Sequence, residues 1–138
     1  MRIMAIDYGD AHTGIAISDP TGLLAGFTTV INSRRQEVVV EQVTLLAKEH
    51  GAEELVLGHP VNMDGTLGPR SEKAKAMKVQ LEEATALPVV LWDERRTTID
   101  AHNILFNSGK NAKQRKKVVD AVAASLILEG YLTFKKSH

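Results

Sequence analysis

The order of its short apolar runs is the feature that most constrains the fold of this chain. Three β-rich runs come first, separated by residues that favour turns, and they lie at 2–8, 14–20 and 23–31. A helical pattern follows at 33–50 and ends at Gly51, a residue type that commonly stops helices. The first part of the chain is therefore predicted to form three strands and then a helix.

The second half of the chain alternates strand and helix patterns. The predicted strands lie at 54–58 and 87–92, and the predicted helices at 71–86, 97–107 and 113–134. Strands joined through a helix usually run parallel, so the first, fourth and fifth strands should be parallel and the opening hairpins antiparallel. We predict an α/β fold with a five-stranded mixed sheet, a three-strand meander followed by β-α-β, in one domain covering 1–138.

Composition excludes several classes of protein. The chain has no cysteine, which excludes disulfides and thiolate metal sites and fits a reducing compartment. No apolar run is long enough to cross a bilayer, and Asp7 interrupts the N-terminal run too early for a signal peptide. We therefore expect a cytoplasmic protein with no membrane partner. The 17 basic and 17 acidic residues balance, so net charge alone does not indicate nucleic-acid binding.

Three acidic residues stand where a predicted core element meets a predicted loop: Asp7, Glu94 and Asp120. Ligands of open sheets bind beyond the carboxyl ends of the parallel strands, where Asp7 and Glu94 are expected. Asp120 would approach the same edge if the last helix packs across the sheet. Carboxylates brought together repel one another unless a cation or a proton compensates them, so a converging trio predicts a metal site. Oxygen ligands select Mg²⁺ or Mn²⁺.

Each of these acids also has an ordinary structural explanation. Asp7 could accept backbone hydrogen bonds in a turn. Glu94 could pair with a neighbouring arginine, and Asp120 could form a helical salt bridge with the lysines that precede it. For each residue taken alone, these explanations are at least as good as a metal site.

Two further segments carry groups suited to phosphate. The loop 58–70 is rich in glycine, whose backbone can approach a phosphate closely, and 110–117 contains five basic residues. Turn chemistry and a solvated helix start are the alternative explanations. The aromatic content of 4% disfavours base stacking as the main mode of recognition. The predicted nucleic-acid contacts are His12, Asn62, Arg70, Arg95, Lys113, Arg115 and Lys116.

Four segments in this order resemble the YqgF-type family, also called RuvX-type Holliday junction resolvases. They read MRIMAIDYGDAHTGIAISDP, LVLGHPVNMDGTLGPR, PVVLWDERRTT and KQRKKVVDAVAASLILEGYL. The resemblance implies a ribonuclease H-like fold with helices on both faces of the sheet. It also implies a bacterial metal-dependent nuclease whose acidic site is Asp7, Glu94 and Asp120. Its substrate would be precursor ribosomal RNA, in maturation of the 5′ end of the small-subunit RNA, or branched DNA.

The chain departs from this family pattern at two histidines. Family members often carry arginine where His12 stands, and leucine where His59 stands. Histidine is not permanently charged, so any phosphate contact through His12 would weaken as the pH rises past about 6.5.

Three functions are open at this point. In a metal-dependent nuclease, two divalent ions about 3.5–4 Å apart would activate water and stabilise the departing oxygen. Asp7 would bridge both ions, while Glu94 and Asp120 would each hold one. The second function is a nucleic-acid-binding maturation factor that cuts little, and the third is a small-molecule kinase, which the short chain and the lack of a P-loop disfavour. The choice between RNA and DNA, and between monomer and homodimer, stays open.

Overall fold

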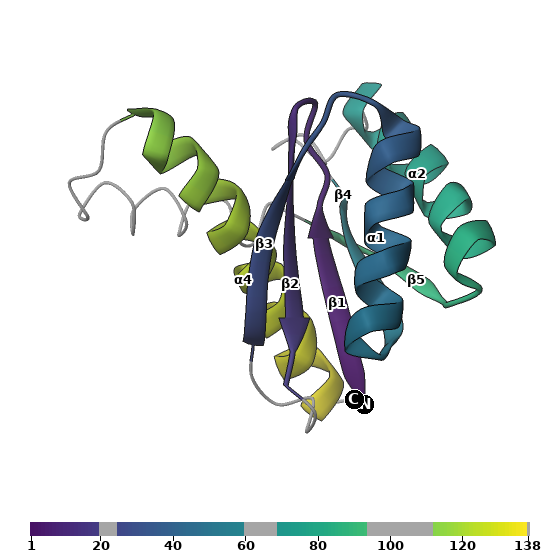
Figure 1. The fold of residues 1–138 in the computed structure, drawn as a ribbon. Coiled ribbons are helices and arrows are strands. Elements are labelled where there is room, and N and C mark those ends of the chain that lie inside the picture. Colours follow the sequence, from purple (N-terminus) through teal and green to yellow (C-terminus); the bar gives the residue numbers. More distant parts are fainter. Residues whose placement is uncertain (20–24, 60–68, 94–111, 138) are drawn as a thin grey trace.

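Five strands form one mixed sheet in the order β3-β2-β1-β4-β5 (Figure 1). This computed structural model describes residues 1–19, 25–59, 69–93 and 112–137, with side chains left out at 25, 69–70, 112–121 and 136–137. The strands are β1 (Arg2–Asp7), β2 (His12–Ser18), β3 (Ala25–Asn32), β4 (Ala52–His59) and β5 (Val89–Asp93). The helices of the described part are α1 (Gln36–His50), α2 (Pro69–Thr85) and α4 (Ala112–Ser137).

The pairing of the strands confirms the predicted mixed sheet. β2 runs antiparallel to both β1 and β3, which makes the opening meander. β1 pairs parallel with β4, and β4 pairs parallel with β5. α1, α2 and α4 correspond to three predicted helices with small shifts at their ends, and the predicted helix at 97–107 lies outside the described residues. In the described part, no helix has the length and apolar character needed to span a bilayer.

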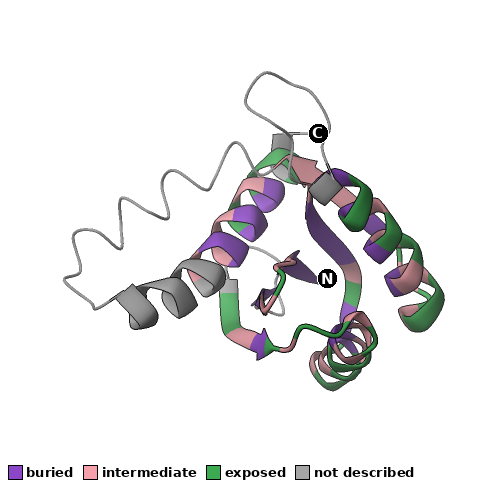
Figure 2. Ribbon diagram, turned by 90° about the horizontal axis from the view of Figure 1, so that it is seen from above, coloured by how far each residue is buried: buried purple, intermediate pink, exposed green. Residues whose placement is uncertain are grey.

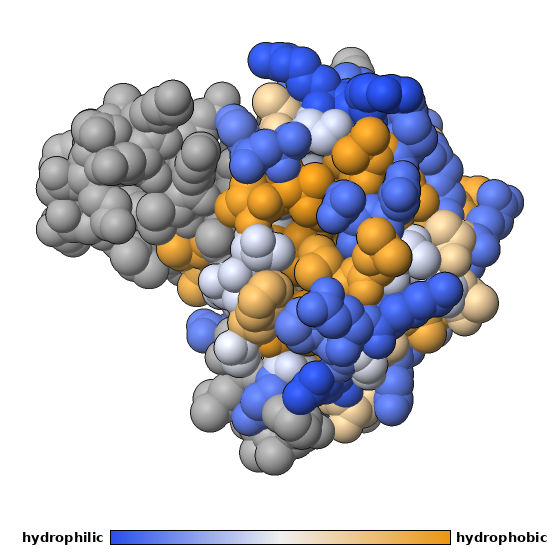
Figure 3. Space-filling view, in the orientation of Figure 1, coloured by the Kyte–Doolittle hydropathy of each residue, from blue (hydrophilic) through white to orange (hydrophobic). Residues whose placement is uncertain are grey.

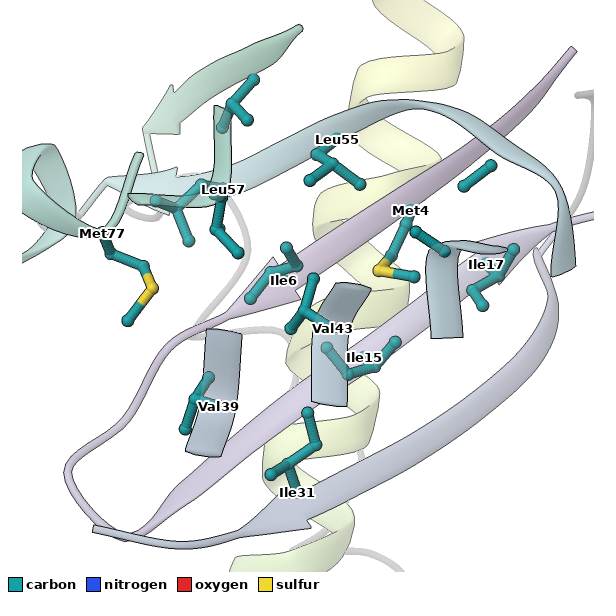
Figure 4. Close-up of a cluster of buried hydrophobic side chains, with 14 of the residues drawn as sticks. Met4, Ile6, Ile15, Ile17, Ile31, Val39, Val43, Leu55, Leu57 and Met77 are labelled. Atoms are coloured by element: carbon teal, nitrogen blue, oxygen red, sulfur yellow. The ribbon is translucent and has the colours of Figure 1, made fainter. Parts of the chain in front are cut away.

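Helices cover both faces of the sheet, as expected (Figure 2). Because side chains alternate along a strand, the central strand β1 contributes to two cores. Met4 and Ile6 pack with the residues of α1 and α2, in the cluster drawn in Figure 4. Ile3 and Ala5 pack with the residues of α4 on the opposite face. All four side chains are buried, so β1 is held from both sides.

Contacts near its C-terminus fix the direction of α4. The Tyr131 hydroxyl donates a hydrogen bond to the Glu54 carboxylate, near the start of β4. Lys135 lies 3.3 Å from the second oxygen of Glu54, and Trp92 of β5 meets the Tyr131 ring edge to face at 5.8 Å. Burial raises the pKa of Tyr131, and the bonded Glu54 carboxylate adds to this effect. The end of α4 is therefore fastened beside the start of β4, and its beginning points toward the opposite end of the sheet.

A side-chain hydrogen bond ties the end of β4 to the start of α2. His59 Nε2 and Ser71 Oγ lie 2.5 Å apart, and Ser71 is fully buried. The bond fixes the end of β4 relative to the first turn of α2.

Gly9 is required by space rather than by backbone conformation. A Cβ atom added there would lie 2.3 Å from the backbone oxygen of His12. Because a backbone atom cannot move aside alone, we expect Gly9→Ala to lower the free energy of unfolding by about 1–3 kcal/mol. Gly26→Ala is the matched control, since its nearest neighbours lie at 3.4 Å. Denaturant titration checks this, and equal values for the two variants would contradict it.

The bond between His59 and Ser71 can be measured with a double-mutant cycle. Ser71→Ala leaves a half-buried ring nitrogen without its partner, so we expect it to lower the free energy of unfolding by about 1–3 kcal/mol. In a His59→Leu background the same substitution should lower the free energy of unfolding by a smaller amount. The difference between the two backgrounds should be about 0.5–1.5 kcal/mol. An equal cost in both backgrounds would show that the two side chains are not coupled.

Candidate active site

Three parallel strands end at one edge of the sheet, and we call their last residues, Asp7, His59 and Asp93, the carboxyl edge. The register keeps these ends together: Ile6 pairs with Leu57, and His59 pairs with Asp93. Asp7 itself is half-buried and pairs with Gly14 of β2. The predicted convergence of strand ends is therefore confirmed for the first, fourth and fifth strands, with Asp7 on β1, the central strand of the whole sheet.

The alternation of side chains assigns Asp7 to the face that α4 covers. Ile3 and Ala5 belong to the α4 core, and Asp7 follows at the same two-residue spacing. The neighbouring strand end is directed the other way, since His59 bonds to Ser71 of α2. A ligand held by Asp7 would thus lie between the sheet and the α4 layer, and the candidate site is on this face.

The spacing along α4 puts position 120 on the same helical stripe as the residues that pack against the sheet further along the helix. Ala124, Ile127 and Tyr131 are buried against the sheet. Asp120 precedes Ala124 by one helical turn of about 3.6 residues, so its backbone lies on the same stripe.

The length of α4 can be compared with that of the sheet. From Tyr131 back to Asp120, a helix rising about 1.5 Å per residue covers roughly 16 Å. From Glu54 to Gly58, beside Asp7, a strand rising about 3.3 Å per residue covers roughly 13 Å. Because Tyr131 is bonded to Glu54, α4 is long enough to extend past the end of β4. In Figure 1 α4 crosses the strands obliquely, and its first half extends past β3 and away from β1.

The complete acidic trio is not part of what the structure describes. Glu94 directly follows Asp93, the last residue of β5, and lies outside the described residues, as do Asn62 and Arg95. Among the described residues, no three histidine or acidic side chains gather closely enough to hold a metal ion. The metal site formed by Asp7, Glu94 and Asp120 therefore stays a prediction. The donors it would use, carboxylate oxygens, are of the type that Mg²⁺ and Mn²⁺ prefer.

Positive charge gathers at the starts of the helices near this edge. Arg70 is the second residue of α2, while Lys113, Arg115 and Lys116 occupy the first turns of α4, which has no acidic residue in its first turn. α1 also begins at this end, just after the exposed Arg34 and Arg35. Figure 3 shows hydrophilic surface over the upper end of the molecule, around the start of α1 and the β1–β2 connection.

The predicted contact His12 also lies at this edge, at the start of β2. Its Nδ1 is 2.7 Å from Asn32 Oδ1 in an exposed hydrogen bond, which orients the ring at the end of β3.

One ion pair at this edge could not be anticipated from the sequence. Lys73 of α2 places its Nζ 3.7 Å from the Asp10 carboxylate, in the connection between β1 and β2. Only the folded arrangement brings these two residues together, because no spacing rule links residues so far apart.

Comparison with known proteins identifies relatives along almost the whole chain. Residues 1–134 match the protein family described as RuvX, Holliday junction resolvase. A Halothermothrix orenii protein named "Putative pre-16S rRNA nuclease" is 43% identical over 135 residues, covering 98% of this chain and 96% of its own.

Solved structures support the fold. Thermus thermophilus RuvC in complex with a Holliday junction substrate superposes with a TM-score of 0.63 at 13% identity, covering 99% of this chain and 96% of its own. A ROK hexokinase from Thermus thermophilus gives a TM-score of 0.52 at 23% identity, over 75% of this chain but only 38% of its own. At these identities the likeness concerns the fold, which is RuvC-like and ribonuclease H-like, as predicted. On the match of residues 1–134 and the 43% identity, the chain belongs to the RuvX family.

Proposed function

We propose that this protein is a metal-dependent nuclease that hydrolyses phosphodiester bonds of structured nucleic acid, in 5′-end maturation of pre-16S ribosomal RNA. The observation that carries the proposal is the position of Asp7, a half-buried carboxylate at the end of the central strand. The substrate is inferred from the name of the 43% identical relative, whose length this chain matches almost completely. Reaction class and substrate thus have separate supports.

In the proposed site, Asp7, Glu94 and Asp120 would hold Mg²⁺ or Mn²⁺, with Asp7 as the bridging ligand when two ions bind. Bound divalent ions make a water molecule more acidic and compensate the charge that develops on the phosphate. Asp7 is suited to this role because its pairing with Gly14 of β2, and the pairing of the preceding Ile6 with Leu57 of β4, fix its backbone. A rigid first ligand lowers the entropy cost of assembling the site.

The remaining groups would bind and orient the substrate. Arg70 lies in the first turn of α2, and Lys113, Arg115 and Lys116 lie in the first turns of α4. These residues would contact backbone phosphates, together with Arg95 and Asn62. His12 would add a contact from the start of β2, held by Asn32. Contacts of this kind fix the register of a nucleic acid without reading its sequence, which suits a substrate recognised by shape.

Two other functions retain support from particular observations. Resolution of branched DNA is favoured by the description of the family and by the likeness to RuvC. Paired cuts at a four-way junction would call for a two-fold dimer, whereas trimming an RNA end would not. A maturation factor that binds RNA but cuts little would use the same basic side chains.

The kinase alternative has only the fold in its favour. The hexokinase that superposes is a longer protein, of which this chain spans 38%, so most of that enzyme has no counterpart here. Small-molecule kinases of this type close two such cores around a nucleotide, and we therefore do not propose this activity.

The proposal is tested by cleavage of labelled precursor ribosomal RNA and of a four-way DNA junction, side by side, with Mg²⁺, Mn²⁺ or a chelator. We expect metal-dependent cutting of the RNA. Asp7→Asn should lower the rate by more than roughly 100-fold, since losing even an outer partner of a metal ligand typically costs 10- to 100-fold. Binding should persist in this variant, because the phosphate contacts remain.

Glu53→Gln is the control, since Glu53 is exposed at the opposite end of β4 and should leave the rate unchanged. Cutting of the junction alone would select the DNA alternative. Absence of cutting with both substrates, while binding persists, would overturn the nuclease and favour the maturation factor.

A further inference from the structure

The basic residues of α2 lie between its first turn and its middle, and its last turn contains none. They are Arg70, Lys73, Lys75 and Lys78, and the first turn also holds the acidic Glu72. A helix is stabilised by acids at its start and by bases at its end, each by about 0.3–1 kcal/mol. The helix dipole therefore accounts for Glu72 and gives no reason for a lysine at position 73.

The lysines of α2 differ in the partners they meet. Lys75 lies 3.8 Å from Glu72, and Lys78 lies 3.4 Å from Glu82, so both pair within the helix. Lys73 instead lies 3.7 Å from Asp10, across the gap between α2 and the β1–β2 connection. It is thus directed toward the segment that leaves β1 shortly after Asp7.

The pair formed by Lys73 and Asp10 is open to exchange. The side chain of Lys73 is 59% exposed and that of Asp10 is 71% exposed. Exposed pairs of this kind contribute about 0–1 kcal/mol and are screened by salt. The ammonium group can therefore leave the carboxylate for a phosphate oxygen at little cost to the fold.

We propose that Lys73 is a substrate-binding residue that contacts a backbone phosphate of the nucleic acid. Asp10 holds the ammonium beside the carboxyl edge while the site is free, and it competes with the phosphate for that ammonium. The inference rests on the proposed function, since it assumes that nucleic acid binds at this edge. It extends the predicted contacts, which did not include Lys73.

The salt dependence of binding tests this proposal. The probe is a labelled RNA spanning the 5′ end of mature 16S RNA in its precursor, bound to full-length Asp7→Asn protein so that no cutting interferes. The binding constant falls with salt, and removing one phosphate contact makes the slope of log K against log salt less steep by about 0.7–0.9. We expect this decrease for Lys73→Gln and a retained slope for Lys73→Arg. Lys75→Gln is the matched control and should keep the wild-type slope.

Substitution of Asp10 should change the binding affinity in the opposite direction to substitution of Lys73. Asp10→Asn should tighten binding at low salt, and this gain should shrink when Lys73 is already glutamine. A gain of equal size in both backgrounds would mean that Asp10 acts on the substrate directly, and this would overturn the proposed competition.

Equal slopes for Lys73→Gln and Lys75→Gln would overturn the phosphate contact, and so would the absence of any salt-dependent binding. The cleavage assay is independent of both results. The wild-type protein could fail to cut RNA while Lys73→Gln still makes the salt dependence of binding less steep. That result would overturn the proposed nuclease activity and support the phosphate contact of Lys73.

Discussion

The parallel pairing of β1 with β4, and of β4 with β5, is the constraint on which the rest of the site depends. It brings the ends of three strands to one edge, although the chain passes through long connections between them. A shift of this register by one residue would turn every side chain of β1 to the opposite face. Asp7 would then leave the α4 side, and the buried Met4 and Ile6 would lose their places among the residues of α1 and α2. The core and the candidate site are therefore fixed by the same hydrogen bonds.

The two faces of the sheet are packed by side chains of different size, and this difference bears on the site. Toward α1 and α2, the central strands present large groups such as Met4 and Ile15. Toward α4 they present two small side chains, Ala5 and Ala16. Ala124 of α4 is buried in the same cluster. Small residues allow the helix axis to approach the strands closely, because interhelix and helix–sheet spacing follows side-chain size. Ala124 lies one turn beyond Asp120, on the face to which Asp7 belongs.

Sequence patterns were sufficient for the elements and their order because hydrophobic periodicity and turn residues act locally. Gly51, for example, ends α1 as predicted, and the structure shows it in the left-handed conformation. The same patterns could not reveal the bond from Tyr131 to Glu54 or the pair of Lys73 with Asp10, because such partners meet only after the sheet has assembled. Asp7 was found from the sequence because it ends a strand. The contribution of Glu94 stays a prediction, since it follows the last described residue of β5.

The distribution of charge explains how a chain of zero net charge could bind an anionic substrate. A carboxylate such as Asp7 repels phosphate, so a nucleic acid needs compensating cations close by. α4 begins with bases and has no acid in its first turn, the end where the helix dipole favours acids, and each such base costs a few tenths of a kcal/mol in helix stability. Natural proteins tend to accept local conflicts of this kind at functional sites. α2 begins at the same end of the sheet, with Arg70 and Glu72 in its first turn and Lys73 directed toward Asp10. An anionic ligand at that end would account for the basic start of α4 and for the position of Lys73.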